Sequence, residues 1–109
     1  MLRMSDAAKI RALNDAARRT LIGCRVMVTS GVQALGRLPV VLAAVRSFDD
    51  FHADNDPYGE HDFGSIELFG EKLFWKFDYY DLALSFASPD PADPSVTTRV
   101  LTIMLADEY

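Results

Sequence analysis

The sequence predicts a single small α+β domain, with a mainly antiparallel sheet of three to four strands built around a central β-hairpin and about three helices. Two segments, residues 5–19 and 39–51, carry apolar residues at helical spacing. Two runs rich in aromatic residues, 63–69 and 72–79, flank a glycine-containing turn. Since the chain has 109 residues, it has room for one hydrophobic core and not for two.

The first expected helix begins after Ser5, whose hydroxyl can accept a hydrogen bond from the first turn, and runs to about Arg19. Apolar and small residues recur along it every three or four positions, so one face should lie on the core. The opposite face is expected to be polar and mostly basic, with Lys9, Arg11, Asp15 and Arg18. This helix is therefore predicted to be amphipathic and basic.

A strand is expected over residues 24–29, because β-branched and apolar residues dominate there. Gly23 precedes this segment, and Ser30 and Gly31 end it. We expect this strand to lie in the centre of the sheet.

A second helix is expected to start at Pro39, since proline is tolerated in a first helical turn, and to end near Asp50 or Phe51. Residues 52–62 follow it. Turn-forming residues and carboxylates are dense there, and no apolar period is sustained. We therefore expect an exposed acidic loop.

The strongest local signal is the hairpin, with Gly70 and Glu71 as a two-residue type II′ turn. Side chains alternate between the two faces of each strand. The core face is expected to carry Gly64, Ile66, Leu68, Leu73, Trp75 and Phe77. The opposite face mixes aromatic rings with charges of both signs, and is expected to be half covered or a contact surface: Phe63, Ser65, Glu67, Phe69, Lys72, Phe74, Lys76 and Asp78. Glu67 and Asp78 are expected to pair with Lys72 and Lys76.

The C-terminal part allows two interpretations. A short strand is expected over residues 82–86, followed by a proline-rich connector over residues 88–94. Asp93 before Pro94 then favours a helix start, and apolar residues on one helical face support a C-terminal helix. A strand is the alternative, because Val96, Thr98, Val100 and their neighbours also alternate with a β-branched bias.

Charge is divided unevenly along the chain, whose net charge is −5. The first 48 residues hold eight Arg and Lys against two Asp, and the remainder holds fourteen Asp and Glu against three Lys and Arg. Such asymmetry favours an interaction with a charged partner or between the two halves. Neither a signal sequence at residues 1–6 nor an apolar run long enough for a membrane span is visible, and Cys24 is the only cysteine. We expect a cytoplasmic protein.

Three segments carry a resemblance to a known family: DNDPYGEHDFG at residues 54–64, FWKFDYYD at 74–81 and TRVLTIML at 98–105. They resemble the hallmark blocks of a family of small bacterial proteins known only as a domain of unknown function. The resemblance covers nearly the whole chain. It implies an association with plasmid and other mobile-element genes, and no activity.

The acidic loop is the first candidate site, because clustered carboxylates with a histidine suit a hard divalent cation. Its candidate ligands are Asp54, Asp56, Glu60, His61 and Asp62. Their spacing matches no firm metal motif, so a solvated or turn-stabilising role is favoured over metal binding. No phosphate-binding glycine loop is visible, and we expect no cofactor.

Other candidates are weaker. His61, with His52 nearby, could act as a general base, but packing or hydrogen bonding at the loop exit is favoured. Cys24 beside Arg25 is expected to be an inert packing residue. The basic residues of the first helix, with Arg25, could contact phosphates, yet a solvated face or a contact with the acidic half is favoured over nucleic acid.

The leading functional hypothesis is a non-enzymatic binding protein that presents an acidic and aromatic surface to a basic partner. Its expected binding residues are Asp54, Asp56, Tyr58, Glu60, His61, Asp62, Phe69, Phe74 and Tyr80. With the mobile-element context that the resemblance implies, this suggests an inhibitor of a host defence nuclease complex, an anti-CRISPR or antirestriction protein, acting by protein contact or nucleic-acid mimicry. The alternatives are a small metal-dependent hydrolase or nuclease using the acidic loop, and a structural homo-oligomer.

Overall fold

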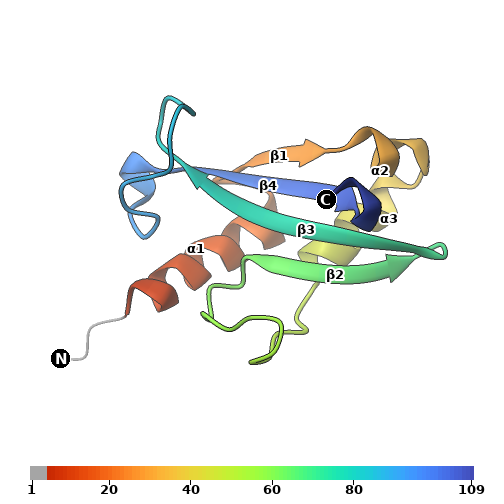
Figure 1. The fold of residues 1–109 in the computed structure, drawn as a ribbon, viewed down its shortest axis with the longest axis horizontal. Helices are drawn as coiled ribbons and strands as arrows, with labels where there is room; N and C mark the ends of the chain where they lie inside the picture. Colours follow the sequence, from red (N-terminus) through yellow and green to blue (C-terminus); the bar gives the residue numbers. More distant parts are fainter. Residues whose placement is uncertain (1–4) are drawn as a thin grey trace.

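The computed structural model describes residues 5–109 and has a four-stranded mixed sheet with helices on one face (Figure 1). The strand order is β1-β4-β3-β2, in which β1 pairs with β4 in parallel and the other two pairs are antiparallel. The strands are β1 (Arg25–Val28), β2 (Phe63–Leu68), β3 (Glu71–Tyr80) and β4 (Thr98–Leu105). The helices are α1 (Asp6–Thr20), α2 (Ser30–Ala34) and α3 (Leu38–Arg46), with single 3₁₀ turns η1 (Pro94–Val96) and η2 (Ala106–Glu108). The α+β class and the mostly antiparallel sheet are confirmed.

The core lies between the helices and one face of the sheet. Its buried residues come from all three helices and from the two central strands: Ala17, Val32, Val41, Val45, Leu73, Trp75, Phe77, Leu101 and Ile103. Trp75 and Phe77 are thus core residues, as expected. Residues 1–4, part of the segment expected to lack a signal sequence, lie outside the described residues. Among the helices of residues 5–109, none has the length and apolar character that a membrane crossing requires.

Helix α1 follows the prediction at both ends. The Ser5 hydroxyl accepts a hydrogen bond from the Ala8 N–H at 3.2 Å, and Leu21 ends the helix in the left-handed conformation with φ 60°. The outward placement of Arg18 was wrong, because its side chain is completely buried against the aromatic core. Burial is tolerated because its nitrogens reach Asp15 at 3.0 Å and the Phe48 carbonyl at 3.1 Å.

Strand β1 lies at an edge of the sheet, so its predicted central position was wrong. The C-terminal segment takes the central place instead: β4 pairs over eight residues with β3 and over four with β1. A short helix, α2, follows β1 where only a strand end was expected. The Glu108 carboxylate fixes its start by accepting hydrogen bonds from the Thr29 hydroxyl at 2.7 Å and the Gly31 N–H at 3.2 Å.

Helix α3 ends at Arg46, earlier than the predicted end near Asp50 or Phe51. The Ser47 hydroxyl donates a hydrogen bond to the Ala43 carbonyl at 2.8 Å at this end. The chain then turns so that Phe48 and Phe51 pack edge-on against Trp75, with ring centroids 5.4 and 6.1 Å away. Packing on the tryptophan therefore outweighs continuation of the helix.

The hairpin is confirmed, with its turn one residue earlier than predicted. Leu68 pairs with Glu71, so the turn residues are Phe69 and Gly70, both with positive φ (56° and 74°). Moving the turn by one residue shifts every cross-strand partner by two, and side chains alternate with period two. The predicted division of residues between the two faces therefore holds.

The C-terminal helix was wrong, and the strand alternative is correct. Asp93 does cap a helical turn, accepting from the Ser95 N–H at 2.9 Å, but the turn is the three-residue η1. After it, β4 satisfies the open edge of β3 along its length. The strand predicted over residues 82–86 was also wrong: this segment forms turns, with one isolated bridge between Tyr80 and Ala87.

Candidate functional site

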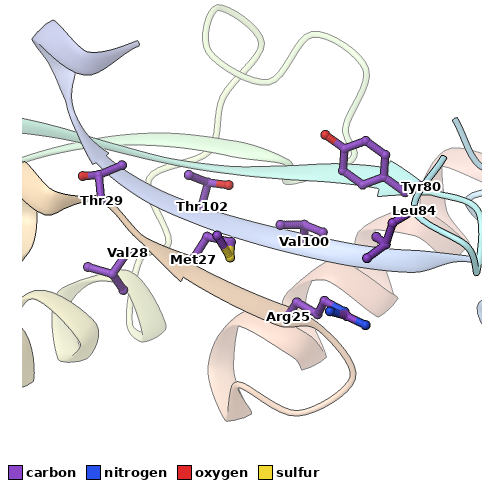
Figure 2. A pocket seen from close by; sticks show the side chains of 8 residues that line it. All are labelled: Arg25, Met27, Val28, Thr29, Tyr80, Leu84, Val100 and Thr102. Atoms are coloured by element: carbon purple, nitrogen blue, oxygen red, sulfur yellow. The ribbon is translucent and has the colours of Figure 1, made fainter. Parts of the chain in front are cut away.

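One candidate site lies on the face of the sheet opposite α1 and α3, which we call the open face; within residues 5–109 no α-helix covers it. Its residues lie on all four strands, because β1 and β4 place alternate side chains on the same side as the polar face of the hairpin. Met27 stands beside Thr102, and Asp78 stands beside Val100. Figure 2 shows several of these side chains on the side of the sheet away from the helices.

A groove of about 500 Å³ runs over the β1 end of the open face. Its lining combines apolar side chains with one cation at the rim: Arg25, Met27, Val28, Thr29, Tyr80, Leu84, Val100 and Thr102. A second hollow of about 400 Å³ continues it towards the C-terminal turn and shares Thr29, Tyr80, Val100 and Thr102 with it. The two form one trough across the sheet.

The segment over residues 81–87, which we call the apolar turn, stands at one end of the groove. It exposes three large apolar side chains, since Leu82, Leu84 and Phe86 are 64%, 40% and 77% accessible. The turn is nevertheless held by hydrogen bonds: the Asp81 N–H donates to the Phe86 carbonyl at 2.8 Å, and the Ser85 N–H donates to the Asp81 carboxylate at 2.9 Å. An ordered turn with exposed apolar side chains is typical of a contact surface.

Two of the charges on the open face, Lys76 and Asp78, form an ion pair. The Lys76 ammonium lies 2.9 Å from the Asp78 carboxylate, and this hydrogen bond raises the pKa of Lys76. The expected pairing of these two residues is therefore present, whereas Glu67 stands opposite Lys72 without a salt bridge between them among residues 5–109. Arg25 remains as an exposed cation at the groove rim.

The three aromatic binding residues predicted on the hairpin occupy different places. Tyr80 lines the groove and is 37% exposed. Phe74 is half-buried among Phe63 and Tyr109, with ring centroids 5.0 and 5.8 Å away. Phe69 lies at the hairpin turn, where the Arg37 guanidinium covers its ring at 4.4 Å. Only Tyr80 is brought to the groove.

The acidic loop divides into an exposed and a packed part. Asp54 and Tyr58 are exposed, Tyr58 to 80%, as expected for this loop. Asp56, Glu60 and His61 are partly buried instead, which corrects the picture of a fully exposed loop: His61 contacts Asp15 of α1, and Asp56 lies beside His61. The loop backbone is bound too, since the Gly59 carbonyl accepts from Arg11 at 3.1 Å.

His61 is fixed on three sides. Its ring stacks on Phe51 at 3.7 Å between centroids, and its Nδ1 lies 2.9 Å from the Asp15 carboxylate. Its backbone has φ 53° and its N–H donates to the Asp56 carboxylate at 3.1 Å. Asp62, the next residue, is half-buried, and burial raises the pKa of its carboxyl. These contacts agree with the expectation that His61 packs and hydrogen-bonds at the loop exit.

Asn14 is the centre of a buried polar network, and the sequence analysis did not single it out. Its amide nitrogen donates to the Glu60 carbonyl at 3.0 Å and the Tyr79 hydroxyl at 2.8 Å, and its oxygen accepts from Arg99 Nε at 2.9 Å. The Tyr79 hydroxyl donates in turn to the Glu60 carboxylate at 3.0 Å, and burial raises the pKa of this phenol. A polar residue on the expected core face of the first helix was the available signal.

The structure also bears on two weaker candidates, a metal site and Cys24. Within residues 5–109, no group of three or more His, Cys, Asp and Glu side chains is arranged to hold a metal ion. Cys24 is half-buried with its Sγ 3.9 Å from the Ala17 carbonyl, and burial raises the pKa of its thiol. A raised thiol pKa lowers the thiolate fraction, which agrees with a packing role.

Comparison with known proteins identifies the family. The sequence model of the family described as "Protein of unknown function (DUF3768)" matches residues 28–108. The chain belongs to this family. The match covers α2, α3 and the strands β2, β3 and β4. It includes the acidic loop, the apolar turn and most of the open face. No curated protein and no solved structure matches the chain.

Proposed function

We propose that the protein is a non-enzymatic binding protein that holds a basic protein partner on its open face. The observation that carries this proposal is the groove, which is lined by Leu84 of the apolar turn, together with the two further exposed apolar side chains of that turn, Leu82 and Phe86. Interfaces are anchored by a few aromatic and aliphatic side chains that fill pockets, and a groove of about 500 Å³ accepts one or two such anchors.

Charge supports a basic partner. The chain has a net charge of −5, and the exposed carboxylates of Asp49, Asp50 and Asp54 cluster in one segment with the exposed ring of Tyr58. Such a distribution accelerates association with a positively charged surface and disfavours nucleic acid. The acidic loop would then contribute to the rate of encounter, and the groove to the lifetime of the complex.

Nucleic-acid-binding effectors are the partner class with the matching surface, because they display Lys and Arg along the path of the phosphates. We therefore extend the proposal to inhibition of a host defence nuclease complex, of the anti-CRISPR or antirestriction kind. A protein on such a surface blocks DNA binding by occupying it, with no catalytic residue required.

The experiment is competition with DNA for a panel of purified CRISPR effector complexes and restriction endonucleases, at low and at high salt. The protein is expected to displace DNA from one of them at low salt and less well at high salt. Leu84→Ser is expected to abolish the effect, whereas Val40→Ser on α3 preserves it, although the two residues are similarly exposed (40% and 45%). An absence of competition for every effector at low salt rejects the nuclease target.

Self-association through the open face is the competing outcome. Sedimentation velocity at the same two salt concentrations detects it. A dimer that Leu84→Ser dissociates and Val40→Ser preserves would assign the groove to a second copy of this chain, in place of a basic partner.

A further inference from the structure

A separate pocket lies on the helix side of the sheet, away from the open face. It has a volume of about 280 Å³ and is formed where the C-terminal end of α1 meets η1 and the start of β4. Its walls are mostly apolar or small, and one charged residue lies among them: Leu13, Ala16, Ala17, Ile22, Gly23, Pro94, Thr97 and Arg99. We call it the Arg99 pocket.

Arg99 is a buried cation that forms no direct ion pair, although the Glu60 carboxylate is near enough to favour its charge. It is 4% exposed, and no carboxylate of residues 5–109 forms an ion pair with it. Its Nε donates to the Asn14 oxygen at 2.9 Å, and its Nη2 donates to the Pro91 carbonyl. Within the described part of the chain, its Nη1 makes no hydrogen bond. Neutral oxygens thus take two of its five N–H groups.

A guanidinium in this position has a strong requirement for an anion. Burial disfavours its charge and lowers the pKa of Arg99, and an ion pair is the usual compensation for a buried charge. The guanidinium carbon lies over the ring of Tyr79, 5.3 Å from the ring centroid, and the hydrogen bonds to Asn14 and Pro91 fix the position of the group. A fixed, planar guanidinium matches a carboxylate, which it binds through two parallel hydrogen bonds.

We propose that the Arg99 pocket binds a carboxylate carried on a short aliphatic chain. The carboxylate pairs with the free edge of the Arg99 guanidinium, and the aliphatic part lies against Leu13, Ala17 and Ile22. The volume sets the size, because pockets for drug-sized ligands begin at about 300 Å³. A small carboxylic acid and the C-terminal residue of a peptide share this chemistry.

The test uses hexanoate as the probe and hexanamide as its neutral counterpart, with backbone amide shifts of the ¹⁵N-labelled protein as the readout. Hexanoate is expected to shift the amide signals of Ala17, Gly23 and Thr97 saturably, with a Kd of about 1 mM or below. Hexanamide is expected to leave them unchanged, because it cannot compensate the charge of Arg99. An absence of saturable shifts with hexanoate, or equal binding of hexanamide, overturns the proposal.

Two variants locate the site. Ala16→Leu fills the pocket and leaves every hydrogen bond of Arg99 in place, so it is expected to abolish binding. Ala12→Leu, one turn earlier on the exposed side of α1, is the matched control and is expected to bind like the parent protein. Equal binding by both variants overturns the assignment to this pocket.

Arg99→Lys separates pairing from simple attraction, because a lysine cannot form the two parallel hydrogen bonds. The affinity for hexanoate is expected to fall about tenfold or more. If Arg99→Lys does not fold, the binding of hexanoate by Ala16→Leu tests whether the ligand occupies the Arg99 pocket. N-acetyl-leucine, with a free carboxylate, identifies the source of the ligand: tighter binding than hexanoate assigns a peptide C-terminus, and weaker binding assigns a small acid.

Discussion

At the scale of single residues, the molecule depends on polar side chains inside its core. Asn14 and Arg18 are completely buried, and Arg99 is nearly so. Each makes hydrogen bonds that tie α1 to a distant segment: Asn14 to the acidic loop and β3, and Arg18 to the end of α3. Buried polar groups of this kind stabilise a structure only while all partners remain.

Asn14→Leu is therefore expected to lower the free energy of unfolding by about 3 kcal/mol, because it leaves Arg99 Nε and the Glu60 carbonyl without their partner. Urea denaturation followed by circular dichroism measures the change. Asn55→Leu is the control, since Asn55 makes only local hydrogen bonds in the acidic loop, to His52 and Asp50. Its expected cost is about 1 kcal/mol. Equal costs for both variants would show that the network has no special role.

Asp62 gives a prediction about pH. Burial, with the Asp56 and Asp78 carboxylates nearby, raises its pKa above the ordinary value of 3.8. A raised carboxyl pKa means that the folded protein binds this proton more tightly than the unfolded chain does. The contribution of this tighter proton binding to the free energy of folding is fully present below pH 3.8, and it is lost as the pH rises through the raised pKa that Asp62 has in the folded protein.

Asp62→Asn is accordingly expected to be more stable than the parent protein at pH 7, and the difference should disappear as the pH falls below 3.8. Urea unfolding curves recorded across this pH range check it. Asp54→Asn, at an exposed position, should change the stability by less than about 0.5 kcal/mol at pH 7. A loss of stability for Asp62→Asn at pH 7 would contradict the burial argument.

At the scale of elements, the sequence correctly predicted those parts of the fold that depend on interactions between residues close in sequence. The cap at Ser5 and the alternation along the hairpin involve residues close in sequence, and both predictions are confirmed. The predicted assignment of residues to the two faces of the hairpin is correct although the turn was placed one residue too late. A shift of cross-strand partners by two residues leaves a period-two alternation unchanged.

Elements decided by tertiary contacts were not predicted. Residues 96–104 fit both a helix, which was the favoured prediction, and a strand, and the segment forms a strand because it pairs with the free edge of β3. The same reason explains the misplaced β1, because its neighbour β4 was not expected to exist. The groove could not be predicted either, since its floor joins Met27 to Val100 and Thr102 across the pair β1 and β4. The composition of the acidic loop indicated that it is charged and exposed. Composition could not predict that His61 contacts Phe51 and Asp15, because these contacts depend on the tertiary fold.

The hairpin turn tests the element scale directly. Gly70 has φ 74°, and a Cβ added there would meet no atom within 4 Å, so the cost of a side chain is purely conformational. Gly70→Ala is expected to lower the free energy of unfolding by about 1 kcal/mol. Gly70→Asn should cost less, because asparagine tolerates the left-handed conformation. Thermal unfolding of the three proteins checks the order, which an Ala variant as stable as the parent would contradict.

At the scale of the whole molecule, the sheet has two central strands and two edges, and helices cover only one face. The charge of the acidic half is not neutralised internally: apart from two histidine contacts, the ion pairs among residues 5–109 are Arg18 with Asp15 and Lys76 with Asp78. Most of these carboxylates therefore face the solvent, which supports the basic partner of the proposed function.

The topology predicts how amide protection is distributed. Amides of β3 and β4, which have neighbours on both sides, are expected to exchange with deuterium more slowly than those of β1, which pairs only with β4. Hydrogen exchange followed by NMR measures this order. Protection of β1 equal to that of β4 in the isolated protein would indicate that the β1 edge is covered, as in a dimer.

The parallel pairing of β1 with β4 also has a consequence for biosynthesis. β1 leaves the ribosome before the strand that it pairs with, since that partner, β4, lies at residues 98–105. Helices and the hairpin can form as they emerge, whereas β1 has no strand to join until the chain has been translated that far. The groove, whose floor needs both strands, therefore forms only after β4 has been translated.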